Sequence, residues 1–193
     1  MAAPITELIL VTGFLGSGKT ALLRHWLEVP PKTGIIITEG RQGSALASSF
    51  LPVIEGILER RHWDYILAET SGFTRPALLH DLVIRAEERS RGRLRFGGMI
   101  CVIDALRFLK LFAAVVSLYE QAASADCFVL SKTALAEPSH IQGIQDILHT
   151  IRPLAPVFRL EENPLSFQAI REAIPRASRG KGAAGYAAGE YAV

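Results

Sequence analysis

The chain has few cysteines, almost no net charge and no long apolar run. Its two cysteines among 193 residues, Cys101 and Cys127, are too few for a disulfide framework, and both lie in apolar runs, so we expect buried, reduced thiols. No run reaches the roughly 18 apolar residues of a membrane helix. A net charge of +2 gives little attraction for nucleic acid or a membrane surface. These absences favour a cytoplasmic protein that binds neither nucleic acid nor a membrane.

Short apolar runs alternate with helix-length stretches along the chain. The runs lie at residues 8–11, 34–38, 65–68, 99–103 and 127–130, with a weaker sixth at 157–158. Continuous apolar strands are buried on both faces, which is typical of a parallel sheet covered by helices. Right-handed crossovers place those helices on both faces. The sequence therefore predicts an α/β fold of three layers, with a mostly parallel sheet in the middle.

The stretches between these runs suggest where the helices lie. We expect helices over residues 19–28, from about 52 to 62 and from about 76 onward, and a core-facing helix, or a dimer face, over 106–119. Residues 1–175 are expected to form one nucleotide-binding domain. The stretch 176–193 is rich in Ala, Gly and Arg without an apolar period, and we interpret it as a tail.

A glycine-rich motif follows the first apolar run. Residues 13–20 read Gly-Phe-Leu-Gly-Ser-Gly-Lys-Thr and satisfy the G-x-x-x-x-G-K-[ST] pattern of a phosphate-binding loop between a strand and a helix. The glycines let the backbone amides turn toward an anion at a helix N-terminus. Lys19 is expected to contact the β- and γ-phosphates, and Thr20 to bind Mg²⁺. The backbone groups expected at the phosphates belong to Gly13, Gly16, Ser17 and Gly18.

Acids follow the second and third runs. Glu69, at the end of the third run, is expected near Mg²⁺ or its water shell, and Gly72 is expected to offer its amide to the γ-phosphate. Glu39, after the second run, is expected to orient Mg²⁺ through water or to polarise an attacking water. The predicted catalytic residues are therefore Lys19, Glu39 and Glu69, although both acids also fit the ordinary role of solvated loop carboxylates.

The fifth run ends in Ser131-Lys132-Thr133-Ala134. In GTP-binding relatives this place carries Asn-Lys-x-Asp, whose aspartate accepts two hydrogen bonds from guanine. Ala134 stands at the aspartate position and accepts none, so base discrimination should be weakened. Ser131 and Lys132 remain candidates for nucleotide contact, since the Lys132 stem is long enough to lie along a base. The nucleotide is therefore GTP or ATP.

Together these motifs resemble the CobW-type metallochaperone GTPases, cousins of the urease and hydrogenase nickel-insertion GTPases. The matching segments are residues 11–20, 64–72, 102–105, 125–126 and 131–135. The resemblance implies a P-loop GTPase core, nucleotide-dependent pairing as a homodimer and delivery of a transition metal to a client metalloprotein. The family's Cys-x-Cys-Cys motif is absent, and its Asn-Glu-Phe-Gly motif is reduced to Thr-Glu-Gly-Arg at 38–41. The chain thus resembles a shortened, diverged member.

Three functions follow as hypotheses. The first is a Mg²⁺-dependent nucleoside triphosphatase that acts as a slow switch, because Phe73 follows Gly72 where a water-orienting Gln would be needed. The second is a regulatory module that binds nucleotide without hydrolysing it. The third is a small-molecule kinase, for which the arginines of the stretch 85–95 would have to form a lid. That stretch also fits a solvated helix end or a docking surface for an acidic partner.

Overall fold

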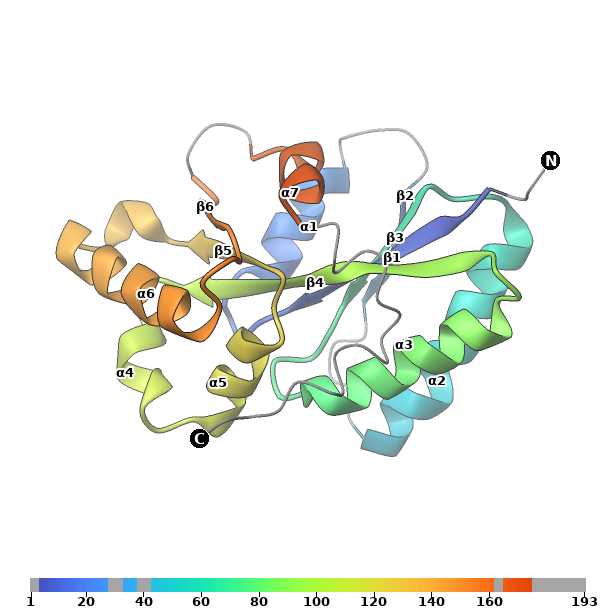
Figure 1. Cartoon of the computed structure of the whole chain (residues 1–193), viewed down its shortest axis with the longest axis horizontal. Helices are drawn as coiled ribbons and strands as arrows, with labels where there is room; N and C mark the ends of the chain where they lie inside the picture. Colours follow the sequence, from blue (N-terminus) through green and yellow to red (C-terminus); the bar gives the residue numbers. More distant parts are fainter. Residues whose placement is uncertain (1–3, 28–32, 38–42, 162–164, 175–193) are drawn as a thin grey trace.

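The computed structural model describes residues 4–27, 33–37, 43–161 and 165–174. Its six strands form one sheet in the order β2-β3-β1-β4-β5-β6, and every neighbouring pair is parallel (Figure 1). The strands are β1 (Thr6–Thr12), β2 (Thr33–Ile37), β3 (Tyr65–Glu69), β4 (Leu94–Asp104), β5 (Cys127–Ser131) and β6 (Val157–Arg159). The predicted parallel sheet is confirmed, and the weak sixth run is its edge strand.

Helices cover both faces of this sheet. They are α1 (Lys19–Leu27), α2 (Gly43–Arg60), α3 (Pro76–Arg89), α4 (Phe108–Phe112), α5 (Val116–Ala123), the 3₁₀ turn η1 (Thr133–Leu135), α6 (Pro138–Ile151) and α7 (Phe167–Ala173). In Figure 1, α1 and α7 lie above the sheet, α2, α3, α4 and α5 lie below it, and α6 lies beside its left end, where it packs in one core cluster with α4 and α5. The predicted three-layer arrangement is therefore confirmed.

Alternation along β1 shows how the two faces are filled. Leu8 and Leu10 pack with apolar residues of α2 and α3, whereas Ile9 and Val11 pack with those of α1 and α7. All four side chains are fully buried. Successive strand residues point to opposite faces, so a continuous apolar run fills two cores at once. This burial fixes where β1 ends, and with it the position of the loop that follows.

The second helix begins nine residues earlier than the sequence suggested. It starts at Gly43 and includes Pro52, the predicted first residue, in its interior. An interior proline removes a backbone hydrogen bond and costs about 3 kcal/mol. The buried side chains of Leu46, Phe50 and Ile54 follow at helical spacing across the proline, and their packing offsets that cost. Tertiary packing therefore overrides the local proline signal.

The single helix expected over 106–119 is instead two short helices, so this prediction was wrong. The Leu111 carbonyl accepts hydrogen bonds from the amides of both Ala114 and Val115, and Val115 is extended, which ends α4 and starts α5 in a new direction. The turn allows Phe108 and Leu118 to enter the same core cluster. The idea that this segment forms a dimer face stays a prediction.

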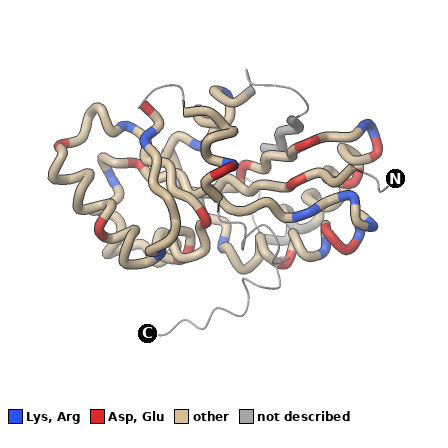
Figure 2. The backbone as a smooth tube through the Cα atoms, turned by 45° about the horizontal axis from the view of Figure 1, so that its top comes forward, with Lys and Arg blue, Asp and Glu red and all other residues tan. Residues whose placement is uncertain are grey.

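The arginine-rich stretch lies at the amino end of the sheet. Arg95 pairs with Glu7 at 2.5 Å, Arg93 donates to the Leu58 carbonyl, and Arg89 pairs with Glu55. Figure 2 shows basic and acidic segments side by side at this end of the molecule, near the N-terminus. β4 separates these arginines from its carboxyl end by roughly 30 Å, at about 3.3 Å per residue. The stretch is therefore placed away from the phosphate loop and does not fit the lid of a kinase.

The two cysteines lie on neighbouring strands but face opposite sides of the sheet. Cys101 stands opposite Phe128 and Cys127 opposite Ile100, and the two thiols belong to different core clusters. Burial raises the pKa of Cys101 to about 12 and raises that of Cys127 as well. The expectation of buried, free thiols is confirmed. Because the two thiols face opposite sides of the sheet, they cannot bind one metal ion together.

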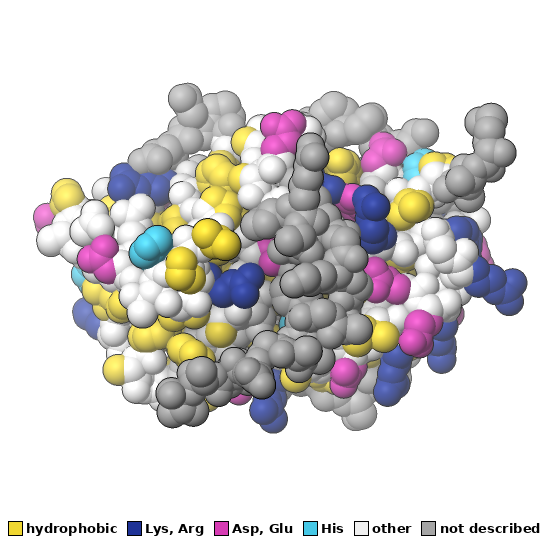
Figure 3. Space-filling view, in the orientation of Figure 1, with side chains coloured by type: hydrophobic (Ala, Val, Ile, Leu, Met, Phe, Trp, Pro, Cys, Tyr) yellow, Lys and Arg dark blue, Asp and Glu magenta, His cyan; other side chains and the backbone are white. Residues whose placement is uncertain are grey.

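On the face shown in Figure 3, basic and acidic side chains lie interspersed.

Within the described ranges, no helix combines the length and apolar character needed to cross a bilayer. Glu39 and the proposed tail at 176–193 lie outside the described residues.

Candidate functional site

The predicted motifs meet at one edge of the sheet. The glycine loop follows β1, Glu69 ends β3, Asp104 ends β4 and Ser131 ends β5, and these four strands are neighbours. Carboxyl ends of parallel strands share an edge, which is where open α/β sheets bind their ligands. A cleft of about 420 Å³ opens there. It is lined by Leu15, Gly16, Gly18, Lys19, Thr20, Ala21, Glu69, Thr70, Ser71, Gly72 and Phe73.

The glycines of the loop are required by its backbone. Gly13, Gly16 and Gly18 have φ of 137°, 71° and 97°, values that L side chains rarely adopt. A Cβ on Gly13 would also lie 2.3 Å from the carbonyl oxygen of Val102 on β4. The loop is therefore held tightly against the neighbouring strand, and it ends at the first residue of α1. This is the strand–loop–helix placement expected of a phosphate-binding loop.

The side chain of Lys19 folds back over this loop. Its ammonium donates to the carbonyl oxygens of Gly13 at 2.8 Å and Phe14 at 3.2 Å, and only 7% of the residue is exposed. The same residue lines the cleft. The loop carbonyls thus hold a positive charge at the place where the predicted anion would bind.

Thr20 and Glu69 come together across the cleft. The Thr20 hydroxyl donates to the Glu69 carboxylate, at 2.8 Å from Oε1 and 3.0 Å from Oε2, although 49 residues separate them. Glu69 is 2% exposed. A hydroxyl and a carboxylate are hard oxygen ligands, and Mg²⁺ is commonly held by one or two such groups together with waters and substrate phosphates. The donor set therefore fits the magnesium ion that the sequence predicted at these residues.

Gly72 is packed directly on the phosphate loop. A Cβ there would lie 2.5 Å from the amide nitrogen of Leu15. The buried side chain of Gln121, on α5, donates to the Gly72 carbonyl at 2.9 Å. Gln121 was not predicted from the sequence. A signal was present, because Leu118, Gln121 and Ala122 lie at helical spacing on the buried face of α5, where a polar side chain needs a partner.

Ser131 and Lys132, the predicted nucleotide-contacting residues after the fifth apolar run, both contact the phosphate loop. The Ser131 hydroxyl donates to the Ser17 carbonyl at 2.6 Å, and the Lys132 ammonium donates to the Gly16 carbonyl at 3.0 Å. Lys132 adopts a left-handed backbone conformation with φ of 62°. The last residue of β5 and the first residue after it therefore each bind a carbonyl of the phosphate loop.

A second carboxylate near this loop was not foreseen. Glu161, two residues beyond β6, accepts hydrogen bonds from the amide of Lys132 and from the Thr133 hydroxyl at 2.7 Å. It lies 28 residues from Thr133, so nothing in the local sequence indicated the contact. Glu161 caps the first turn of η1 and helps to hold the left-handed Lys132 in place.

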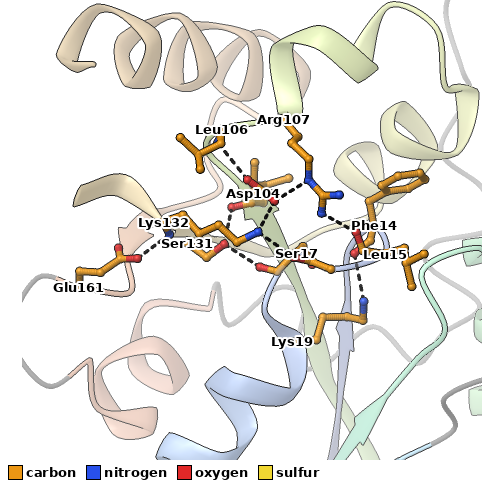
Figure 4. A network of polar contacts seen from close by, with 12 residues as sticks. Phe14, Leu15, Ser17, Lys19, Asp104, Leu106, Arg107, Ser131, Lys132 and Glu161 are labelled. Atoms are coloured by element: carbon orange, nitrogen blue, oxygen red, sulfur yellow. Dashed lines mark hydrogen bonds and ion pairs between the residues drawn. The ribbon is translucent and has the colours of Figure 1, made fainter. Parts of the chain in front are cut away.

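A third unforeseen group joins the loops from β4. Asp104 accepts from Arg107 Nε at 2.8 Å, from Lys132 Nζ at 2.5 Å and from the Leu106 amide at 2.9 Å (Figure 4). Burial alone would raise the pKa of Asp104, but the hydrogen bonds from Lys132 and Arg107 hold this pKa below its usual range. Asp104 is therefore a buried, ionised carboxylate between two cations.

No group of three or more His, Cys, Asp or Glu side chains that would hold a metal ion occurs in the described part of the chain. One histidine of the described residues, His80, is buried. Burial lowers the pKa of His80, and nearby Asp126 and Asp81 partly oppose that change.

Taken together, the parallel three-layer fold and the loop from Gly13 to Thr20 define a P-loop nucleotide-binding protein. A family model described as "CobW/HypB/UreG, nucleotide-binding domain" matches residues 7–44 and 35–159. The match covers most of the chain, so this protein belongs to the CobW/HypB/UreG family.

Individual relatives agree with this assignment. A zinc chaperone CobW from Sinorhizobium sp is 29% identical in an alignment that covers 70% of this chain and 53% of that protein. Among solved structures, Zn(II)-bound YjiA GTPase from E. coli is similar with a TM-score of 0.70 and 19% identity, over 93% of this chain and 64% of that one. HypB from Helicobacter pylori, in complex with nickel, is similar with a TM-score of 0.56 and 15% identity, over 89% and 86%. The chain spans about half the length of the CobW relative.

Proposed function

We propose that this chain binds a magnesium nucleoside triphosphate in the cleft and hydrolyses it slowly as a switch. The observation that carries the proposal is the contact between the Thr20 hydroxyl and the Glu69 carboxylate, next to a buried Lys19. One hydroxyl, one carboxylate and one ammonium lie at a glycine loop whose φ angles are rarely adopted by residues that carry a side chain. This combination suits a polyphosphate and its magnesium ion.

Each residue has a distinct part in this proposal. The amides of the loop from Gly13 to Gly18, apart from that of Ser17, which donates to the Phe14 carbonyl at 3.1 Å, bind the phosphates together with the positive end of α1, and Lys19 neutralises the β- and γ-phosphate charge. Thr20 and Glu69 hold Mg²⁺, which supplies charge stabilisation to the transferring phosphoryl group. The Gly72 amide is proposed to bind the γ-phosphate, and Glu39 to orient or polarise water.

Hydrolysis is expected to be slow in the isolated chain. Phe73 follows Gly72 with its ring edge-on to Phe14, and the nearby Gln121 is buried with its amide group engaged by the Gly72 carbonyl. Neither side chain is placed to orient an attacking water. In a single-turnover assay we expect a rate constant on the order of 10⁻³ s⁻¹ or less. Cleavage near 1 s⁻¹ would contradict the switch, and tight binding with no cleavage would favour the non-catalytic module.

Glu69 gives a test of the magnesium site. Exchange of Glu69 for Gln keeps the shape of the side chain but removes the charge, so the gain in GTP affinity produced by Mg²⁺ should shrink about tenfold. The measurement is a magnesium titration of GTP binding by calorimetry. Glu55→Gln makes the same chemical change at a partly exposed position of α2 outside the cleft and serves as the control. An undiminished magnesium effect in Glu69→Gln would remove Glu69 from the site.

The relatives support metal delivery as the purpose of the switch. The CobW relative is called a zinc chaperone, and the YjiA and HypB structures hold zinc and nickel. We therefore propose a homodimer or a client metalloprotein as the protein partner. Guanine preference is proposed to be weak because Ala134 cannot accept hydrogen bonds, so GTP and ATP are both candidate substrates. The arginine stretch lies at the amino end of the sheet, away from the phosphate loop, so no observation supports the kinase alternative.

A further inference from the structure

Two cations hold two consecutive carbonyls of the phosphate loop. Arg107 Nη2 donates to the Leu15 carbonyl at 2.7 Å, and Lys132 Nζ donates to the Gly16 carbonyl at 3.0 Å. They come from different loops, one after β4 and the other after β5. Both cations also bind the same atom, Oδ2 of Asp104, at 2.8 and 2.5 Å (Figure 4). One carboxylate thus connects two supports of the phosphate loop.

These contacts fix the orientation of the loop peptides. In a trans peptide the carbonyl and the following N–H point in opposite directions. With the Leu15 carbonyl drawn to Arg107, the Gly16 amide points away from Arg107, and Gly16 lines the cleft. With the Gly16 carbonyl drawn to Lys132, the Ser17 amide closes a turn onto the Phe14 carbonyl at 3.1 Å. The two cations therefore specify the shape of the loop that has to bind the phosphates.

Arg107 lies on the outer side of the loop. A Cβ on Gly16 would meet Arg107 Nη2 at 2.7 Å, so the guanidinium lies where a side chain would project from this glycine. About half of the Arg107 side chain is exposed, whereas Asp104 is only 6% exposed. The carboxylate is thus the buried member of the group and the one that both cations share.

We infer that Asp104 is a positioning residue, which holds the phosphate loop in its binding shape through Arg107 and Lys132 before the nucleotide arrives. The inference rests on the proposed nucleotide binding and adds the residue that pre-organises it. A loop already in the bound shape loses less conformational freedom on binding, so affinity rises without a new contact to the ligand. Without the carboxylate, two like charges would remain side by side and their hold on the carbonyls would loosen.

The test compares Asp104→Asn with Asp146→Asn, the same change on the exposed face of α6. The ligands are Mg-GTP and magnesium tripolyphosphate, which has no base. We expect Asp104→Asn to weaken both by about tenfold, because the loss arises at the phosphate loop. Asp146→Asn should leave both unchanged. Unchanged affinities in an Asp104→Asn protein that melts like the wild type would overturn the inference.

A second variant separates positioning from direct contact. Arg107→Lys keeps the charge but loses the planar fork that reaches both Asp104 and the Leu15 carbonyl. The inference predicts the same proportional loss for GDP, GTP and tripolyphosphate. A loss confined to the triphosphates would mean that Arg107 touches the terminal phosphate, and would overturn the positioning role.

A readout without ligand keeps this test independent of the proposed function. In the amide NMR spectrum of the ligand-free protein, Asp104→Asn should shift the Gly16 and Ser17 resonances, whereas Asp146→Asn should not. Unshifted resonances would overturn the inference even if nucleotide binds. If Asp104→Asn shifts these resonances but the wild-type chain binds neither ligand, the positioning role of Asp104 is supported and the proposed function is rejected.

Discussion

Replacing Lys19 with alanine is expected to lower the affinity for Mg-GTP by at least about 100-fold, since hydrogen bonds to charged groups contribute about 1.5–3 kcal/mol each and two phosphates lose their cation. The Gly13 and Phe14 carbonyls already hold the ammonium over the loop. Little conformational entropy is therefore lost when the ammonium binds the phosphates. Isothermal titration calorimetry at fixed Mg²⁺ measures the effect.

The matched control for this variant is Lys110→Ala, on the exposed side of α4. It removes the same charge from the chain and should leave the affinity unchanged. If Lys19→Ala binds Mg-GTP as tightly as the wild type, the assignment of the cleft as a phosphate site is wrong.

Gly13→Ala is expected to destabilise the fold by at least about 3 kcal/mol, combining a strained backbone with a backbone clash. Its φ is 137°, and the new Cβ would meet the Val102 carbonyl oxygen at 2.3 Å. Neither β1 nor β4 can move to relieve this, because both are central strands with paired neighbours on each side. Urea unfolding followed by circular dichroism measures the change.

Gly56→Ala provides a control of opposite sign. Gly56 lies inside α2, and a Cβ there would meet nothing within 4 Å. Alanine in a helix is favoured over glycine, so this variant should be more stable than the wild type by about 0.5–1 kcal/mol. Equal stability of the two alanine variants would show that the loop does not have the backbone described here.

The sequence was sufficient where the signal is local. The apolar runs located all six strands, and the spacing from Gly13 to Thr20 located the phosphate loop between β1 and α1. Glu69 ends β3 and the phosphate loop follows β1, and because these parallel strands are neighbours, Glu69 lies beside Thr20; its role at a magnesium ion stays a prediction. The direction of the strands also distinguishes the amino end of the sheet from its carboxyl end. The sequence alone could therefore have placed the arginines that precede β4 at the end away from the phosphate loop.

The remaining features depend on contacts between distant segments. Gln121 reaches Gly72 across 49 residues, and Glu161 reaches Thr133 across 28. Asp104 appeared in a matching motif, but its role depends on Arg107 and Lys132 arriving from two loops. The start of α2 and the break between α4 and α5 likewise follow from packing that no short window of sequence contains.

The wild-type chain titrated with Mg-GTP and Mg-ATP tests the central claim most directly, namely that residues 13–20 form a polyphosphate site completed by Thr20 and Glu69. We expect saturable one-to-one binding of both nucleotides, dependent on Mg²⁺, with similar affinities for the two bases. Absence of binding for both nucleotides, with and without Mg²⁺, in a chain shown to be folded would contradict it.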